Sequence, residues 1–237
     1  MKLSAPIYHL KRKAKAMSRD EGIPLHAALD RIAAIEGFAT WSLLAAKLAS
    51  APRAARLYAT LRPGDLVLVG ARPRQGKTLL SLELAVEAMK AGNRGLFFSL
   101  EYTEKDVIER FQSIGADPTG FGALFSFESS DAINADYIIA RLQQERPGTL
   151  AVVDYLQLLD QKRVNPDLMT QVRALRAFAE AAGQIIVFVS QIDRAFEASA
   201  KPCPDLDDIR LPNPLDLTLF SKTCFLNRGE IRFGAAA

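Results

Sequence analysis

Cysteine and histidine are scarce in this sequence of 237 residues. The two cysteines, Cys203 and Cys224, belong to no CxxC or Cys/His pattern, and the two histidines have no partner ligand at a useful spacing. A disulfide framework or a structural zinc site requires such spacing. The pattern therefore indicates neither, and we expect both cysteines to be reduced thiols packed inside the protein.

Long apolar runs and a large charge excess are also missing. No stretch approaches the roughly 18 uncharged apolar residues of a membrane helix, and the basic N-terminus lacks the apolar segment of a signal peptide. We therefore expect a cytoplasmic protein without membrane contact. The net charge of +3 is well below the excess expected of a protein held mainly by phosphate contacts, so nucleic acid is permitted but not demanded.

The chain is long enough for one sizeable α/β domain but not for two. Residues 1–50 predict a small helical module, with helices around 9–19, 24–36 and 40–49 and an apolar stripe in the second. Residues 51–63 are interpreted as a linker, and residues 64–237 as the main domain.

Strands alternate with helices throughout the main domain, which is typical of a parallel sheet covered on both faces. The helices are expected to separate the strands and to end at glycines such as Gly92 and Gly183. Thr103, followed three residues later by Asp106, predicts a capping box at the start of one of them. Five short apolar runs predict buried strands at 66–69, 95–100, 124–127, 150–153 and 185–189, helices are expected at 77–91, 103–113, 132–144 and 168–182, and a closing hairpin is expected around Asn227-Arg228-Gly229.

The clearest motif is ARPRQGKT at 71–78, which follows a predicted strand and begins a predicted helix. Backbone N–H groups in such a P-loop, with the helix N-terminus, form a cradle for phosphate oxygens. Lys77 would bring its charge to the β and γ phosphates, and the Thr78 hydroxyl would bind Mg²⁺. A Gly-Lys-Thr that only caps a helix is the alternative. The residues predicted to hold nucleotide are Arg72, Pro73, Arg74, Gln75, Gly76, Lys77, Thr78 and Leu79.

Two carboxylates follow predicted strands. Asp154 ends the run LAVVD, where P-loop enzymes place an acid for Mg²⁺, and Glu101 ends the run before the helix at 103. Ligands bind at this edge of an open parallel sheet, so Glu101 is a candidate for orienting the water that attacks the γ phosphate. An ordinary acid at a strand end, or an exposed glutamate before a helix cap, is the alternative for each.

Polar residues also follow the last central strand, in SQIDR at 190–194. Gln191 could sense the γ phosphate through a hydrogen bond, and Arg194 could contact a phosphate or a carboxylate. As polar loop residues, they could equally have no such role.

The motifs ARPRQGKT, SLE at 99–101, VVDYLQLL at 152–159 and SQIDR, in this order, resemble the ATPase domain of DnaB-type replicative helicases, which are RecA-like P-loop proteins. The resemblance covers about residues 60–235 and implies a mostly parallel twisted sheet flanked by helices. It implies ATP and Mg²⁺ as cofactors, Lys77 and Thr78 as their ligands, Glu101 as catalytic base, Asp154 as magnesium acid, and Gln191 as a link to the DNA loops. It also implies a homo-oligomeric ring, hexameric in that family, on single-stranded DNA.

Three features depart from that family. The helical residues 1–50 replace its large N-terminal collar. A Lys-x-Arg pair that acts on the neighbouring subunit's ATP is reduced to Lys222, with Arg228 as another candidate finger. The segment 194–214, expected to face DNA, carries three aspartates that repel phosphate. Candidate nucleic-acid contacts are Lys162, Arg163, Arg194 and Lys201, and a basic cluster on the first helix, which could also be a solvated face, comprises Lys11, Arg12, Lys13, Lys15 and Arg19.

The leading hypothesis is an ATP-hydrolysing motor of DnaB-like type acting on single-stranded DNA. The alternative is a RecA-like ATPase that acts as an assembly switch or regulator without unwinding, which the missing arginine and the acidic segment favour. A binding adaptor with vestigial hydrolysis is the third reading.

Overall fold

The computed structural model describes residues 3–5, 7–49, 52–160, 165–211 and 213–235. The chain divides into two compact units, Met1–Leu61 and Arg62–Ala237. No helix in the described part of the chain is long and apolar enough to cross a membrane.

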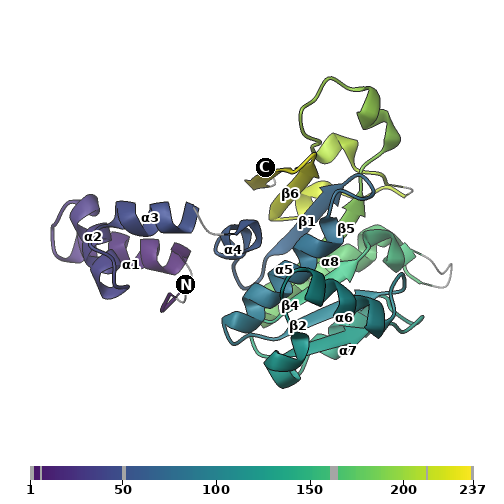
Figure 1. The fold of residues 1–237 in the computed structure, drawn as a ribbon, viewed down its shortest axis with the longest axis horizontal. Coiled ribbons are helices and arrows are strands. Elements are labelled where there is room, and N and C mark those ends of the chain that lie inside the picture. The colour runs from purple at the N-terminus through teal and green to yellow at the C-terminus, as the bar shows by residue number, and fades with distance from the viewer. Residues whose placement is uncertain (1–2, 6, 50–51, 161–164, 212, 236–237) are drawn as a thin grey trace. The chain divides into compact units, whose positions relative to one another are not determined.

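The first unit is helical (Figure 1). Its helices are α1 (Ile7–Asp20), α2 (Leu25–Ile35), α3 (Trp41–Ala49) and α4 (Arg53–Tyr58). Leu10 and Ala14 of α1 pack with Ala28 and Ile32 of α2 in a small core that Trp41 partly covers. The middle of the apolar stripe predicted in the second helix is therefore buried, whereas its ends, Leu25 and Ile35, are exposed.

Helix α4 lies in the segment 51–63 that was interpreted as a linker. Pro52 stands at the N-cap of this helix, where its fixed φ and missing N–H are tolerated. Ala54 and Leu57 of α4 are buried, so the segment contributes to a core and does not serve only as a connection.

The second unit is built on a seven-stranded sheet in the order β3-β2-β4-β5-β1-β6-β7. Every neighbouring pair is parallel except β6 with β7, which closes the sheet as an antiparallel hairpin. The fold class and the five predicted strands are thereby confirmed. The strands are β1 (Leu66–Ala71), β2 (Gly95–Ser99), β3 (Phe125–Glu128), β4 (Leu150–Asp154), β5 (Ile185–Gln191), β6 (Lys222–Asn227) and β7 (Glu230–Ala235).

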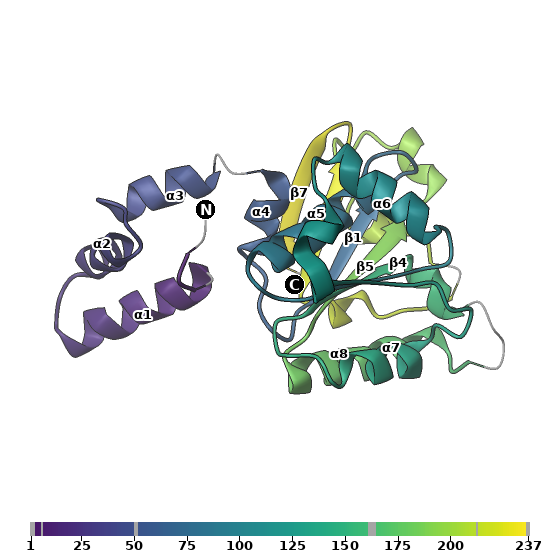
Figure 2. The same cartoon turned by 60° about the horizontal axis from the view of Figure 1, so that its bottom comes forward.

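Helices cover both faces of this sheet (Figure 2). One face carries α5 (Lys77–Lys90) and α6 (Glu104–Ser113), and the other carries α7 (Ala135–Leu142) and α8 (Leu168–Ala182). Covered on both sides, β1, β2 and β4 are buried at every position, which explains their continuous apolar sequence. Short 3-10 helices join these elements: η1 (Pro118–Leu124), η2 (Leu156–Asp160), η3 (Arg194–Ala198), η4 (Leu206–Asp208) and η5 (Leu217–Leu219).

Local signals in the sequence set several helix ends. The Thr103 hydroxyl accepts the backbone N–H of Asp106, and the Asp106 carboxylate accepts the N–H of Thr103, in the expected capping box. Gly183 ends α8 in the left-handed conformation that glycine adopts without strain. Both cysteines are free and buried, as expected.

Gly70 occupies a crowded position of β1. A Cβ atom there would lie 2.8 Å from Cε1 of Phe225 and 3.0 Å from Cδ1 of Ile209. The glycine next to the P-loop is therefore explained by packing across β6, since a side chain would push an aromatic ring out of the core.

We expect Gly70→Ala to lower the free energy of unfolding by about 1–3 kcal/mol, because overpacking a close-packed core forces neighbours out of position. Chemical denaturation followed by circular dichroism measures the change. Gly120→Ala is the matched control, since a Cβ there meets no atom within 4 Å and its φ is not positive. Equal stability of the two variants would contradict the packing explanation.

Candidate functional site

The candidate site lies where the parallel strands end. Ala71 of β1 stands opposite Gln191 of β5 and Leu226 of β6, and Ser99 of β2 stands opposite Asp154 of β4. This register aligns the carboxyl ends of the strands along one edge of the sheet, which is where open α/β sheets bind ligands.

The segment 71–78 forms a tight turn between β1 and α5. Arg74 and Gly76 both have positive φ, at 65° and 86°, and Gly76 is the N-cap of α5. Among the described residues, no side chain caps this 14-residue helix at its N-terminus. The first backbone N–H groups of α5 can therefore donate hydrogen bonds to an anion, as a phosphate cradle requires.

Lys77 and Thr78 begin α5 beside the turn. Thr78 is only 9 % exposed, and its hydroxyl lies 3.5 Å from the hydroxyl of Tyr102. The Lys77 carbonyl accepts a hydrogen bond from the Ser81 hydroxyl. The sequence prediction of a P-loop in a strand–turn–helix context agrees with this geometry, whereas the ligands of each residue stay predictions.

Asp154 is the most unusual group of the site. It is fully buried, and neither carboxylate oxygen has a hydrogen-bond partner among the described residues. The pKa of Asp154 is raised to about 6, chiefly because burial disfavours the charged form; the nearby Thr78 hydroxyl and the Lys77 charge oppose this rise, and the Glu101 charge adds to it. Thr78, Lys77 and Glu101 therefore all lie close enough to this buried acid to affect its pKa.

Glu101 is exposed, in contrast to Asp154. Its backbone N–H donates to the Ser99 hydroxyl at 3.1 Å, which fixes the chain as it leaves β2. The neighbouring Tyr102 ring is covered by the Arg110 guanidinium at 4.0 Å from the ring centroid. Glu101 therefore stands in solvent beside a buried acid, which suits a carboxylate that works on water.

A polar network at the end of β5 was not expected from the sequence. Arg210 donates its backbone N–H to the Gln191 carbonyl at 2.8 Å and its guanidinium to the Gln191 side-chain oxygen at 3.4 Å. Gln157 donates to the carbonyl of Arg210 and to the hydroxyl of Ser190. No local sequence signal marks Arg210, because a backbone bridge between Ile192 and Ile209 brings it to β5.

Arg72 was predicted to hold nucleotide, but its side chain turns to protein partners. The guanidinium donates to the Glu197 carboxylate from Nε at 2.8 Å and to the Ile192 carbonyl at 3.0 Å. Nothing in the local sequence pointed to Glu197, which lies 125 positions away. The role of Arg72 in this structure is to tie the P-loop to the segment after β5.

The predicted nucleic-acid contacts are scattered. Lys201 is 3.0 Å from Asp205 and 3.1 Å from Asp208, so two carboxylates already compensate its charge. Arg194 is exposed at the start of η3. Lys162 and Arg163 lie outside the described residues.

The two candidate fingers lie at opposite ends of β6. Lys222 pairs with Val67 near the amino end of β1, far along the strand from the P-loop. Arg228 lies in the turn after β6, and its backbone N–H donates to the Gln75 side-chain oxygen at 2.7 Å. Of the two candidates, Arg228 is therefore the one near the nucleotide-binding turn of its own chain.

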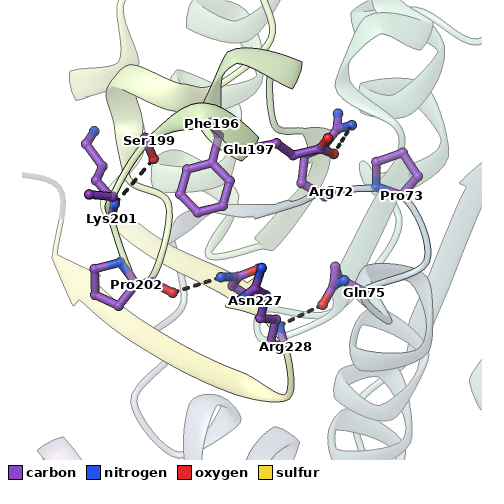
Figure 3. A pocket seen from close by; sticks show the side chains of 11 residues that line it. Arg72, Pro73, Gln75, Phe196, Glu197, Ser199, Lys201, Pro202, Asn227 and Arg228 are labelled. Carbon is purple, nitrogen blue, oxygen red and sulfur yellow. Dashed lines mark hydrogen bonds and ion pairs between the residues drawn. The ribbon is translucent and has the colours of Figure 1, made fainter.

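A cavity of about 600 Å³ opens beside the P-loop. Figure 3 shows its walls: the P-loop on one side, the segment 196–202 on another, and the β6–β7 turn below. Arg72 with Glu197, Gln75 with Arg228, and Asn227 with the Pro202 carbonyl hold these walls together. The cavity therefore shares Arg72, Pro73 and Gln75 with the turn that precedes α5.

The residues present fit a magnesium ion that is held mainly by phosphate. A buried carboxylate without a partner stands near a hydroxyl, and Mg²⁺ bound with nucleotide needs only one or two protein oxygens. The described part of the chain contains no group of three or more His, Cys, Asp or Glu side chains that could hold a metal alone.

Comparison with known proteins agrees with this geometry. Residues 54–117 match the family of the DnaB-like helicase C terminal domain. A solved structure whose title describes an ATPase domain superposes with a TM-score of 0.59, covering 79 % of this chain and 81 % of that one at 21 % identity.

The larger unit is therefore similar to the ATPase domain of DnaB-type helicases.

The proteins to which the sequence is similar include replicative helicases by name. A probable plasmid replicative DNA helicase of Chlamydia trachomatis is 28 % identical over 74 % of this chain and 48 % of its own length. Replicative DNA helicase DnaB of Leifsonia xyli is 29 % identical over 63 % of this chain and 40 % of its own. The chain spans about half the length, or less, of these curated relatives.

A solved structure titled as a DnaB-like replicative helicase with its primase interactions covers 94 % of this chain and 66 % of that one, with a TM-score of 0.60 at 22 % identity. At this identity the likeness concerns the fold. The resemblance drawn from the four motifs is thereby confirmed for the domain, while the activity of the whole protein stays a proposal.

We expect Asp154→Asn to stabilise the nucleotide-free protein at pH 8 by about 1 kcal/mol or more, because a buried amide costs less than a buried unpaired charge. The folded-state pKa of about 6 exceeds the ordinary value of 3.8. The folded state therefore binds more protons than the unfolded state between these values, and wild-type stability falls as pH rises through this window.

Denaturation midpoints at pH 5 and pH 8 measure the effect, which should be larger at pH 8. The exposed Asp207→Asn is the control for a change of net charge. The same melts with ATP, with and without Mg²⁺, should show a magnesium-dependent gain in wild type that Asp154→Asn loses. A gain that survives in the variant would remove Asp154 from the magnesium site.

Proposed function

We propose that this chain binds and hydrolyses ATP with Mg²⁺ and acts as a DnaB-like motor on single-stranded DNA in the cytoplasm. The observation that carries the proposal is the buried Asp154 carboxylate, without a partner among the described residues, beside Thr78, Lys77 and an uncapped helix N-terminus. A buried charge is costly unless it is compensated, and nucleotide-bound Mg²⁺ supplies that compensation.

The P-loop performs the binding step. Backbone N–H groups of the turn and of the start of α5 donate hydrogen bonds to phosphate oxygens, and Lys77 adds a cation at the β and γ phosphates. Thr78 and Asp154 would hold the Mg²⁺. When bound, that ion neutralises charge on the transferred phosphoryl group.

Hydrolysis requires a group that orients water, and Glu101 fits that role. It is exposed at the carboxyl end of β2, next to the strand that carries Asp154. Gln191 is held at the end of β5 by Arg210, so a contact between Gln191 and the γ phosphate would move the segment that includes Arg210. This coupling would carry the state of the nucleotide to the loops after β5.

A homo-oligomeric ring belongs to the same proposal, because the relatives are named replicative helicases. The alternative function, an ATP-driven assembly switch without unwinding, is favoured by the loss of the Lys-x-Arg pair and by the pairing of Lys201 with two carboxylates. The response of ATP turnover to DNA separates the two functions.

We expect single-stranded DNA to raise the steady-state ATPase rate of the wild-type chain. Lys77→Ala should lose ATP binding, because a phosphate-directed charge is gone. Glu101→Gln should bind ATP normally and turn over about a hundredfold more slowly, as loss of a general base predicts. A coupled phosphate-release assay and equilibrium binding of a fluorescent ATP analogue measure these quantities.

The exposed Glu104→Gln, at the start of α6, is the matched control for Glu101→Gln. Turnover that does not respond to DNA would favour the assembly switch, and absence of turnover in wild type would leave a binding adaptor. Normal turnover in Glu101→Gln would remove Glu101 from the catalytic role.

We also propose that the cavity beside the P-loop receives the base and ribose of the nucleotide. Its volume of about 600 Å³ lies within the usual range of ligand pockets. Gln75 and Pro73 line it and also belong to the turn that would hold the phosphates. Phe196 and Pro202 supply apolar surface for a base, and Ser199 and Asn227 supply polar groups.

Ala200→Trp should fill this cavity and weaken ATP binding at least tenfold, because the indole would take the space of the base. Inhibition of ATP binding by tripolyphosphate, which has no base, should be the same in this variant as in the wild type. Ala198→Trp is the matched control, since Ala198 is exposed in the same segment but does not line the cavity. Equal ATP affinity in both variants would place the base elsewhere.

A further inference from the structure

The excess of positive charge is confined to the first unit. Residues 1–61 contain ten Lys and Arg against four Asp and Glu, whereas the remaining residues contain twenty against twenty-three. The net charges are therefore +6 and −3, which the overall value of +3 conceals. A unit of this size with such an excess attracts polyanions over several ångströms.

Four of these cations form one face of α1. With 100° between successive residues of an α-helix, Lys11, Arg12, Lys15 and Arg19 lie within an arc of about 100° and over about 12 Å of the helix axis. All four side chains are exposed. Lys13 is also exposed, but it lies about 100° or more around the helix from each of them.

The position of this face follows from the packing of α1. Leu10 and Ala14 are buried against α2, and Ile7 and Met17 are partly buried in the same cluster. These residues lie outside the arc of the four cations. The basic face therefore remains in solvent within the first unit.

Carboxylates of the first unit do not compensate this face. Glu21 pairs with Arg31, Asp30 accepts the backbone N–H of Trp41, and Glu36 accepts from the backbone N–H of Ser4. The fourth, Asp20, lies about 100° around the helix from Arg19. In the described part of the chain, none of the four cations forms an ion pair with a carboxylate.

The chemistry of this surface favours the phosphate backbone of a duplex. Binding of single strands relies on exposed aromatic rings for stacking, whereas the aromatic side chains of this unit whose burial the structure describes, Phe38, Trp41 and Tyr58, are each partly buried. Insertion into a membrane surface requires apolar side chains beside the cations, whereas the described apolar residues Ile7, Leu10 and Met17 of α1 pack in the core of the unit. Cations at helical spacing, without carboxylate partners, fit a regular array of phosphates.

We propose that α1 binds the phosphate backbone of duplex DNA without sequence specificity through Lys11, Arg12, Lys15 and Arg19. This contact is separate from the ATP site and does not depend on nucleotide. It would hold the protein on the duplex beside any single strand on which the DnaB-type domain acts.

The test measures binding of the full-length protein to a fluorescent duplex of about 25 base pairs by anisotropy, without ATP or Mg²⁺, over a series of salt concentrations. Four phosphate contacts predict a slope of log affinity against log salt near about −3.6. The variant Lys11→Gln/Arg12→Gln/Lys15→Gln/Arg19→Gln should lose nearly all of that slope and at least tenfold in affinity at low salt.

Lys13→Gln and Lys15→Gln form a matched pair of single variants, because both remove one exposed lysine from the same helix. Only Lys15→Gln should weaken duplex binding. Circular dichroism and the DNA-free ATPase rate of the quadruple variant establish that folding and the second unit are intact. Lys77→Ala should bind duplex normally, so failure of the ATPase proposal would leave this result unchanged.

Three outcomes would overturn the proposal. Duplex binding that is equal in wild type and the quadruple variant would exclude the α1 face. A preference for single-stranded DNA of the same length that the quadruple variant loses would assign the face to single strands. Stronger binding to phosphatidylserine vesicles than to duplex, lost in the quadruple variant, would assign it to an anionic membrane.

Discussion

The parallel pairing of β1 between β5 and β6 is the constraint on which the candidate site depends. It fixes Ala71 between Gln191 and Leu226, so that the P-loop, the polar network after β5 and the β6–β7 turn begin at the same edge. Close packing enforces this arrangement, since Gly70 leaves no space for a side chain beside Phe225. The covered faces of the sheet allow the strand ends to carry polar groups, because apolar residues already fill the interior.

The buried carboxylate of Asp154 lies at the proposed nucleotide site, where its burial is energetically unfavourable. Most buried polar groups in a folded protein find partners, whereas both Asp154 oxygens have none among the described residues. The uncapped N-terminus of α5 faces the same region and has the opposite polarity. A nucleotide with its metal would compensate both, so these groups would link nucleotide binding directly to the stability of the unit.

The two units carry net charges of opposite sign. The second unit is acidic overall, and Lys201, a cation after β5, is paired with Asp205 and Asp208. The first unit carries the excess of lysine and arginine on a face that its small core leaves in solvent. Nucleotide chemistry and duplex attachment would then rest on separate surfaces, each of which can be altered without loss of the other.

Local sequence patterns determined much of this protein. Apolar runs predicted five strands, ARPRQGKT predicted the phosphate turn, and Thr103 with Asp106 predicted a capping box, because each depends on residues within a few positions of one another. The order of four motifs identified the domain type. Tertiary structure alone decided that Arg72 binds Glu197, that Arg210 holds Gln191, and that Lys222 and Arg228 lie at opposite ends of one strand. Those contacts depend on strand order and loop paths, which bring together residues far apart in the chain, and no local pattern encodes them.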